Sequence, residues 1–191
     1  MHFERIIMKP AKLFIALSIA ATLAAAAHAQ NSVTASKPDT TSAETTISKD
    51  DAARLVGIAQ ANIAEIEAGK MALKKSSNAD VKAFARMMID DHTKGLEQTR
   101  KVAAAKHVTL PSEPDIGHQK LAAELEALSG KRFDVAYAKR AAVAGHANVL
   151  ASLKKDASAV EDPDVKALAT KLEPTVEHHF EMAKTLAAAV K

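Results

Sequence analysis

The sequence contains no cysteine, no tryptophan and only one tyrosine. Without cysteine the chain forms no disulfide and offers no thiolate to a metal, so its fold must rest on core packing. The same absence excludes lipid attachment of the usual lipoprotein kind. Because aromatic residues make up only 3% of the chain, it lacks a platform on which nucleic-acid bases could stack, and we expect no nucleic-acid partner.

The excess of positive charge is also small. The full sequence has 26 basic and 23 acidic residues, a net charge of +3. Residues 1–29 hold three of the basic residues and one of the acidic residues, so the remainder carries +1. A basic stripe that would attract nucleic acid is therefore not predicted.

Residues 1–29 have the three-part pattern of a secretory signal peptide. A basic start is followed by an apolar run from Leu13 to Ala27, which is short for a membrane span. The run ends in Ala27-His28-Ala29, a small-x-small cleavage pattern that predicts a mature chain starting at or near Gln30. We therefore expect a periplasmic or outer-envelope protein without a transmembrane segment after signal removal. A retained anchor is the alternative.

The next segment, residues 30–48, is rich in serine and threonine and has almost no large apolar side chains. Such a composition cannot offset the entropy lost on ordering, so we expect a flexible tether. Residues 49–191 remain, which is enough for one domain.

This domain is rich in alanine, leucine, lysine and glutamate, and predicts helix nearly throughout. Ser77 and Asp80 resemble a capping box at the start of the second helix. Pro174 lies inside the last helix, where we expect a kink rather than a break. The predicted elements are four long helices, with a short helix between the second and third: 49–75, 79–106, 115–128, 131–157 and 163–190.

An internal repeat indicates how these helices pair. Leu73-Lys74-Lys75 and the following Asp80-Val81-Lys82-Ala83 are echoed at 153–155 and 164–167. The repeat predicts a duplicated helical hairpin, with chance similarity in an Ala/Lys-rich chain as the alternative. Two hairpins would form an all-α four-helix bundle. If residues 106–131 run the length of the bundle, its topology is the ferritin-like crossover; otherwise it is simple up-down-up-down.

Three of the long helices each carry one histidine in a heptad seam, namely His92, His146 and His179. On the first helix, Glu65 lies on a strip beside the main apolar face. With a rise of about 1.5 Å per residue, all four side chains fall near mid-bundle. Imidazole and carboxylate are suitable ligands for zinc, iron, copper or nickel, so these residues form a candidate metal site. The alternative is four buried side chains that serve the core alone.

Other residues give weaker indications. No helix contains the Glu-x-x-His pair of di-iron bundles, which argues against an oxygen-activating di-iron enzyme. We identify no catalytic or cofactor-binding residues, and whether the protein is an enzyme stays open. His107 and His118 are expected in solvent, and His178 outside the seam. The methionines are expected as core filler: Met71, Met87, Met88 and Met182.

Three segments resemble successive motifs of one bacterial family. They are 65–73 (EIEAGKMAL), 81–94 (VKAFARMMIDDHTK) and 128–137 (LSGKRFDVAY). The family consists of exported ferritin-like proteins catalogued as domain of unknown function four-one-four-two, often labelled predicted outer membrane proteins. The resemblance covers Ala52 to Ala189.

The resemblance implies export and a ferritin-like fold, but no reaction. The glutamate and three histidines that recur in the family match Glu65, His92, His146 and His179. Two departures concern the last hairpin: the usual Leu-Pro is Glu173-Pro174 here, and the stretch before Asp162 differs in length.

Two function classes follow from these observations. The first is an envelope bundle, linked to stress, that binds a transition metal through the glutamate and three histidines. The second is a non-catalytic structural or interaction module without metal, with an envelope protein or a second copy of the chain as its partner.

Overall fold

The computed structural model describes residues 47–191, which are almost entirely helical. The all-α prediction is confirmed. The expected signal peptide and residues 30–46 of the expected tether lie outside the described residues. The helices, in chain order, are α1 (Lys49–Lys75), α2 (Ala79–Ala105), α3 (Ile116–Glu126), α4 (Gly130–Ala136), the π-helix η1 (Tyr137–Gly145), α5 (His146–Ala159) and α6 (Pro163–Ala189).

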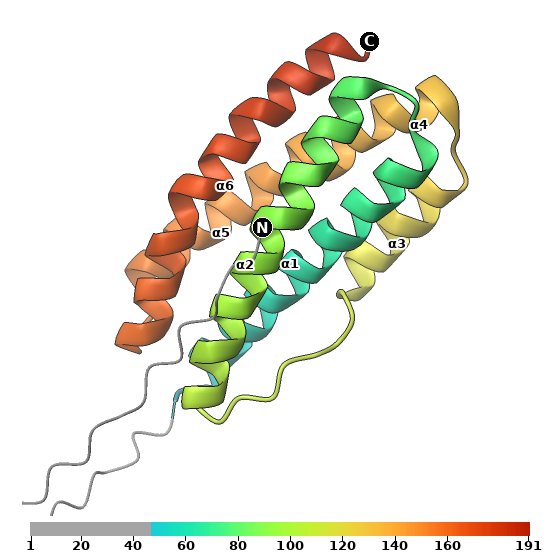
Figure 1. Ribbon diagram of the computed structural model, residues 1–191. Helices are drawn as coiled ribbons and strands as arrows, with labels where there is room; N and C mark the ends of the chain where they lie inside the picture. The colour runs from blue at the N-terminus through green and yellow to red at the C-terminus, as the bar shows by residue number, and fades with distance from the viewer. Residues whose placement is uncertain (1–46) are drawn as a thin grey trace, which may run out of the picture. The chain divides into compact units, whose positions relative to one another are not determined.

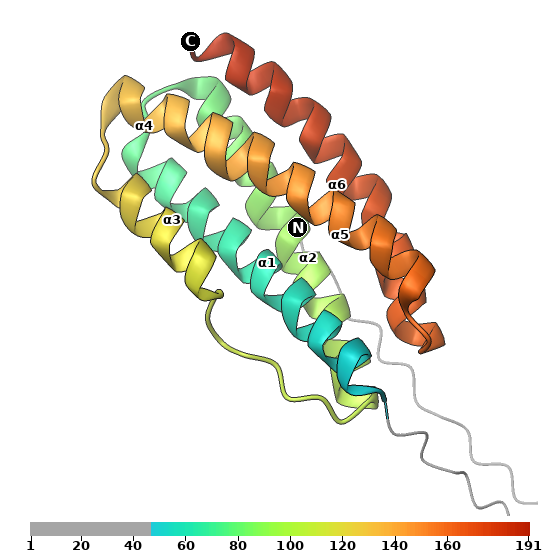
Figure 2. The same ribbon diagram turned by 180° about the vertical axis from the view of Figure 1, so that it is seen from behind.

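The long helices form two antiparallel hairpins, α1 with α2 and α5 with α6 (Figure 1). Helices α4, η1 and α5 follow one another as a single long rod. This rod runs in the same direction as α2, because residues 106–129 carry the chain back along the bundle with α3 beside α1 (Figure 2). Such a crossover is the ferritin-like arrangement, so the up-down-up-down alternative is wrong.

Ile47 and Ser48 make contacts with the helical bundle. Ser48 accepts a hydrogen bond from the backbone N–H of Asp51 at 3.0 Å and so caps α1. Ile47 packs against the apolar core. Both residues were expected at the end of the tether, but their contacts make them part of the bundle.

The two hairpin turns share local structure as well as sequence. Asn78 and Asp162 each cap the following helix by accepting backbone N–H bonds from residues two and three positions on. Val81 and Val165, the matching apolar positions, are both fully buried. The cap expected at Ser77 is wrong, because Asn78 has the extended backbone and the bonded side chain while Ser77 is exposed.

The third long helix is not regular throughout. Its central nine residues form the π-helix η1, with α-helix on either side. The inward side chains Ala138, Ala142, His146 and Leu150 recur every four residues. A step of four residues overshoots the α-helical turn of 3.6 residues and falls short of the wider π turn, so a π segment followed by α-helix keeps these side chains near one face. By contrast, α6 continues through Pro174 without a break.

The core of the described residues contains two large apolar clusters and a small third one formed by Ala59, Ile63 and Leu96. The two large clusters lie along the bundle. One contains Phe84, Met88, Phe133 and Leu186, and the other contains Leu55, Leu153, Leu168 and Val176. Between them lies a layer of buried polar side chains, which we call the polar layer: Asn62, Glu65, His92, His146 and His179.

Helix α1 faces the core with the strip that carries Glu65. Ile58, Asn62, Glu65, Gly69 and Ala72 are all buried. Of the adjacent apolar strip, Leu55, Ala59 and Ile63 are buried as well, whereas Ile66 and Leu73 are half-buried. The strip with Glu65, expected beside the main apolar face, thus shares the core-facing side of the helix. None of the helices within residues 47–191 has an apolar stretch long enough to cross a bilayer.

Candidate metal centre

Three histidines from three helical segments meet in the polar layer. His92 comes from α2, His146 from the first turn of α5 and His179 from α6, with ring centroids 5.3–5.6 Å apart. One ring nitrogen of each lies within 4.8 Å of those of the other two. Each side chain is at most 6% exposed. The equal height estimated from sequence spacing therefore corresponds to direct proximity in the structure.

Hydrogen bonds within the bundle fix one nitrogen of each ring. Asn62 donates its amide N–H to the Ile58 carbonyl at 2.8 Å, so its Oδ1 is left to accept from His92 Nδ1 at 3.0 Å. His146 Nδ1 donates to the Ala142 carbonyl at 2.8 Å. Because both acceptors are oxygens, both rings carry their proton on Nδ1.

His179 is anchored in the opposite sense. Its Nε2 donates to Oδ2 of Asp91 at 3.2 Å. The other oxygen of Asp91 accepts from Lys94 at 2.9 Å, and this bond is the main reason that the pKa of Asp91 lies below its usual value. The carboxylate is therefore ionised at neutral pH, which favours the proton on Nε2 and leaves the His179 Nδ1 lone pair free.

The remaining nitrogens, His92 Nε2, His146 Nε2 and His179 Nδ1, are buried and have no hydrogen-bond partner among residues 47–191. Burial lowers the pKa of His92 to about 3 and of His146 to about 4, so both stay neutral. The pKa of His179 is also lowered by burial. Three lone pairs in one cluster thus lack a donor among the described residues, although an unpaired buried polar group costs about 1–3 kcal/mol.

Glu65 lies beside this group rather than within it. Its Oε1 is 3.8 Å from Nδ1 of His146, the nitrogen that is bonded to Ala142. The side chain is 6% exposed, and burial raises its pKa to about 8. The carboxyl is therefore largely protonated at neutral pH. The structure brings together three of the four predicted residues, and the role of Glu65 as a ligand stays a prediction.

One protein-family model matches the chain over most of its length. Residues 36–186 match the model of the domain of unknown function DUF4142, which is well over half of the chain. The chain belongs to this family. No curated protein and no solved structure matches it significantly. The resemblance of the three sequence motifs is thereby confirmed, and the description of DUF4142 assigns no activity.

Sequence reasoning missed two polar residues that hold the clustered histidines and one buried hydroxyl near Glu65. Asn62 and Asp91 hold two of the histidines, as described above. Tyr137 is buried with its hydroxyl unpaired among the described residues, and its pKa is raised by burial and by the nearby Glu65. Asn62 could have been noticed, because it lies three residues before Glu65 on one strip. The contact of Asp91 with His179 could not have been noticed, because these two residues lie 88 positions apart in the sequence.

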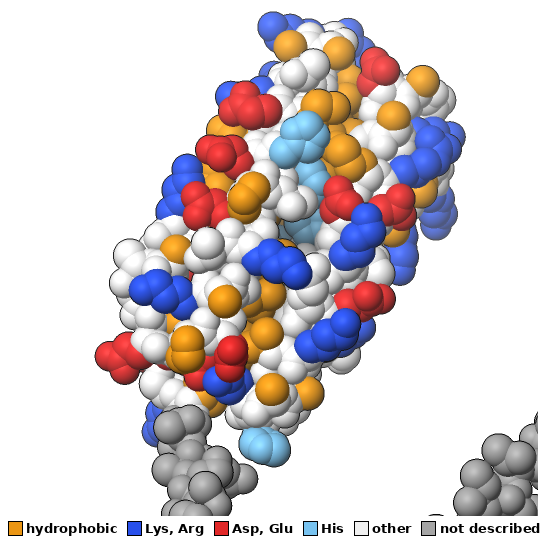
Figure 3. Space-filling view, turned by 60° about the vertical axis from the view of Figure 1, so that its left-hand side comes forward, with side chains coloured by type: hydrophobic (Ala, Val, Ile, Leu, Met, Phe, Trp, Pro, Cys, Tyr) orange, Lys and Arg blue, Asp and Glu red, His pale blue; other side chains and the backbone are white. Residues whose placement is uncertain are grey.

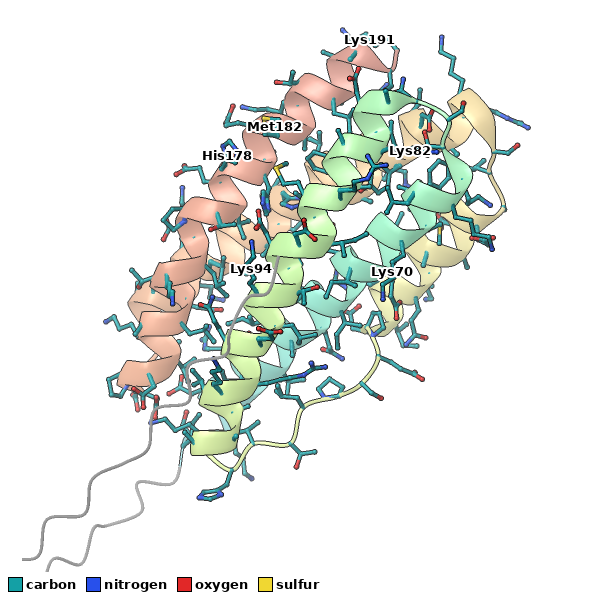
Figure 4. The ribbon with its side chains drawn as sticks, in the orientation of Figure 1. Lys70, Lys82, Lys94, His178, Met182 and Lys191 are labelled. Atoms are coloured by element: carbon teal, nitrogen blue, oxygen red, sulfur yellow. The ribbon has the colours of Figure 1, made fainter. Side chains whose placement is uncertain are left out.

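The other singled-out residues lie apart from the cluster. His178 lies exposed on the outer surface of α6, as predicted (Figure 4). Met182 is 41% exposed, so its assignment to the core is wrong. Met71 and Met87 are half-buried, and Met88 is buried. His107 is exposed, whereas His118 is half-buried and bonds to Asp115 at 2.6 Å.

Gly95 makes room for the side chain that orients His92. A Cβ atom at this position would lie 2.5 Å from Oδ1 of Asn62. We therefore expect Gly95→Ala to destabilise the protein by about 1–3 kcal/mol, as overpacking does, although alanine is the better helix former. Urea denaturation measures the change.

The matched control is Gly57→Ala. Gly57 also lies inside a long helix, but a Cβ atom there would meet nothing within 4 Å. This variant should gain about 0.5–1 kcal/mol from helix propensity. Equal gains for both variants would show that Asn62 does not need the space at Gly95.

Proposed function

We propose that this protein binds one transition-metal ion between α2, α5 and α6, through His92, His146 and His179. One observation carries the proposal: each ring is anchored through one nitrogen, its other nitrogen is buried without a partner among residues 47–191, and one nitrogen of each ring lies within 4.8 Å of one nitrogen of the other two. Metal-binding histidines typically use their second nitrogen in this way, to fix tautomer and ring orientation.

The geometry is suited to a small divalent ion after a modest contraction. Zinc binds imidazole nitrogen at about 2.0–2.1 Å, which places tetrahedral ligand nitrogens about 3.4 Å apart. The observed nitrogens lie within 4.8 Å of one another, so small rotations of the rings would close the site. Neutral imidazoles suit zinc, copper, iron and nickel alike.

Charge gives Glu65 a function in this site. With three neutral imidazoles as ligands, the carboxylate of Asp91 behind His179 is the one negative charge bonded to the cluster, so one charge of a divalent cation stays uncompensated in a largely apolar interior, which is unfavourable. Glu65 is the carboxyl group of the polar layer, and it would compensate one charge after losing its proton. As fourth ligand it would complete a tetrahedral site; as a neighbour it would leave one position open.

Metal titration tests the proposal directly. Protein purified without a histidine tag should bind one equivalent of Co²⁺ or Zn²⁺ by calorimetry. Asp91→Asn, which weakens the bond that orients His179, should lower the affinity about 10–100-fold. Lys94→Gln should have a smaller effect, because Lys94 contacts only the outer oxygen of Asp91. If the parent bound no metal, the non-catalytic structural or interaction module would become the better interpretation. If the Asp91 variant bound metal unchanged, the bond from His179 to Asp91 would not orient a ligand.

We also propose that the chain acts in the periplasm or outer envelope and that its function there is linked to stress. The signal pattern of residues 1–29 supports export. Exported protein should therefore begin at or near Gln30, which intact-mass spectrometry measures. An Ala29→Leu change should block this cleavage, whereas Gln30→Leu should not. If the exported parent protein still carried residues 1–29, a retained anchor would be favoured instead.

A further inference from the structure

A small cavity adjoins the histidine cluster. Its volume is about 40 Å³, and it is bordered by His92 and His179 together with Ile58, Leu153 and Val176. A buried water needs about 10–15 Å³ measured in this way, so the cavity has room for about three water molecules. Its walls are mainly apolar.

The two histidines at the cavity have unpaired nitrogens. His92 Nε2 and His179 Nδ1 are both buried and find no partner within residues 47–191. A metal ion held by these nitrogens would therefore lie at the wall of the cavity. Three histidine ligands leave at least one coordination position for another group, as in catalytic zinc sites.

A larger groove lies elsewhere. It has a volume of about 280 Å³ and is lined by Glu65, Asp115, His118 and Arg140, but by none of the three clustered histidines. A large molecule in this groove would be separated from the unpaired nitrogens by the side chain of Glu65. The small cavity, in contrast, adjoins two rings of the cluster.

We propose that the cavity admits a small exogenous ligand of at most about three heavy atoms to the metal ion. This inference rests on the proposed metal site. The ligand would be a diatomic molecule or a small anion with a lone pair for the metal. Apolar walls offer few hydrogen bonds, so the metal itself must hold the ligand, and a cation with three neutral ligands favours an anion over a cationic group.

The surface is consistent with access from the side of α6. In the view that brings α6 forward, histidine atoms appear both on the surface and in a recess below it (Figure 3). Thr175 of α6 is exposed and Asp91 of α2 is half-buried, and both border the cavity. A small ligand would therefore need to pass between only these two helices.

Visible spectroscopy of the Co²⁺-loaded protein tests this inference, because the absorption bands of Co²⁺ respond to its ligands. Azide, a linear anion of three atoms, should change the spectrum, whereas imidazole should not, because its ring exceeds the cavity. A response to imidazole as strong as that to azide, or no response to azide, would overturn the inference while leaving the metal site intact. Failure of Co²⁺ to bind would overturn both.

A pair of alanine variants localises the effect. Ala61 lines the cavity, whereas Ala64, three residues on in α1, lines the larger groove. Both are half-buried, so valine has a similar cost in helix propensity at either position. Ala61→Val should lower azide affinity about tenfold or more with little change in Co²⁺ affinity, and Ala64→Val should change neither. Equal azide affinity in both variants would show that azide does not occupy the cavity.

Discussion

Replacing Phe84 with alanine is expected to lower the free energy of unfolding by about 3–5 kcal/mol. The side chain is 4% exposed. Its ring packs edge-on against Tyr137 and His146, with centroid separations of 6.3 Å to each. Removing the ring leaves a cavity where the apolar core meets the polar layer. Urea denaturation of the metal-free protein measures the loss.

Phe180 provides the control. Its side chain is half-buried on α6, with the ammonium group of Lys184 4.9 Å from the ring centroid. Phe180→Ala removes the same atoms from a partly solvated site, so it should cost clearly less than Phe84→Ala. A denaturation midpoint for Phe84→Ala equal to that of the parent would contradict the packing described for α2.

The helix boundaries could largely be predicted, because capping and helix-breaking residues mark them. α1 begins and ends at the predicted residues, and α6 begins at Pro163, where a proline in the first turn fits. The π-helix could not be predicted from the same rules. The four-residue spacing from Ala138 to Leu150 is also compatible with a regular α-helix in which these side chains turn gradually around the axis. Only packing against the neighbouring helices decides that the turn widens.

The sequence could predict that the three histidines lie on the core-facing seams of their helices. His92, His146 and His179 each recur with apolar core residues, and helices of similar length place them at one height. The orientation of α1 was not predictable, because apolar residues follow two adjacent strips and either could face the core. Consequently the height of Glu65 was within reach of the sequence, but its position beside His146 Nδ1, outside the group of three nitrogens, was not.

Replacing His146 with glutamine is expected to abolish most of the metal-dependent stabilisation. Metal that binds only the native state stabilises it by about 2.7 kcal/mol when its free concentration is a hundred times the dissociation constant. The parent should show this gain in thermal or urea unfolding with added Zn²⁺. Glutamine cannot place a nitrogen lone pair where His146 Nε2 lies, so the gain should disappear. Without metal, His146→Gln should lower the free energy of unfolding by less than this lost gain.

His178→Gln is the control for this experiment, because His178 is exposed and adjacent in sequence to the cluster. It should keep the full metal-dependent gain. If both variants responded to metal like the parent, the histidine cluster would not be the binding site. If the parent showed no gain, the polar layer would serve the core alone.

The pH dependence of the same gain decides the role of Glu65. A histidine with its usual pKa of about 6.5 would lose metal around that pH. Burial, however, lowers the pKa of His92 to about 3 and of His146 to about 4. If His92 and His146 were the only titrating ligands, the gain should therefore be nearly constant from pH 8 to about 5. Glu65, with its pKa raised to about 8, must lose a proton before it can ligate. If it does ligate, the gain should fall by about 1.4 kcal/mol for each pH unit below 8, and Glu65→Gln should remove that slope.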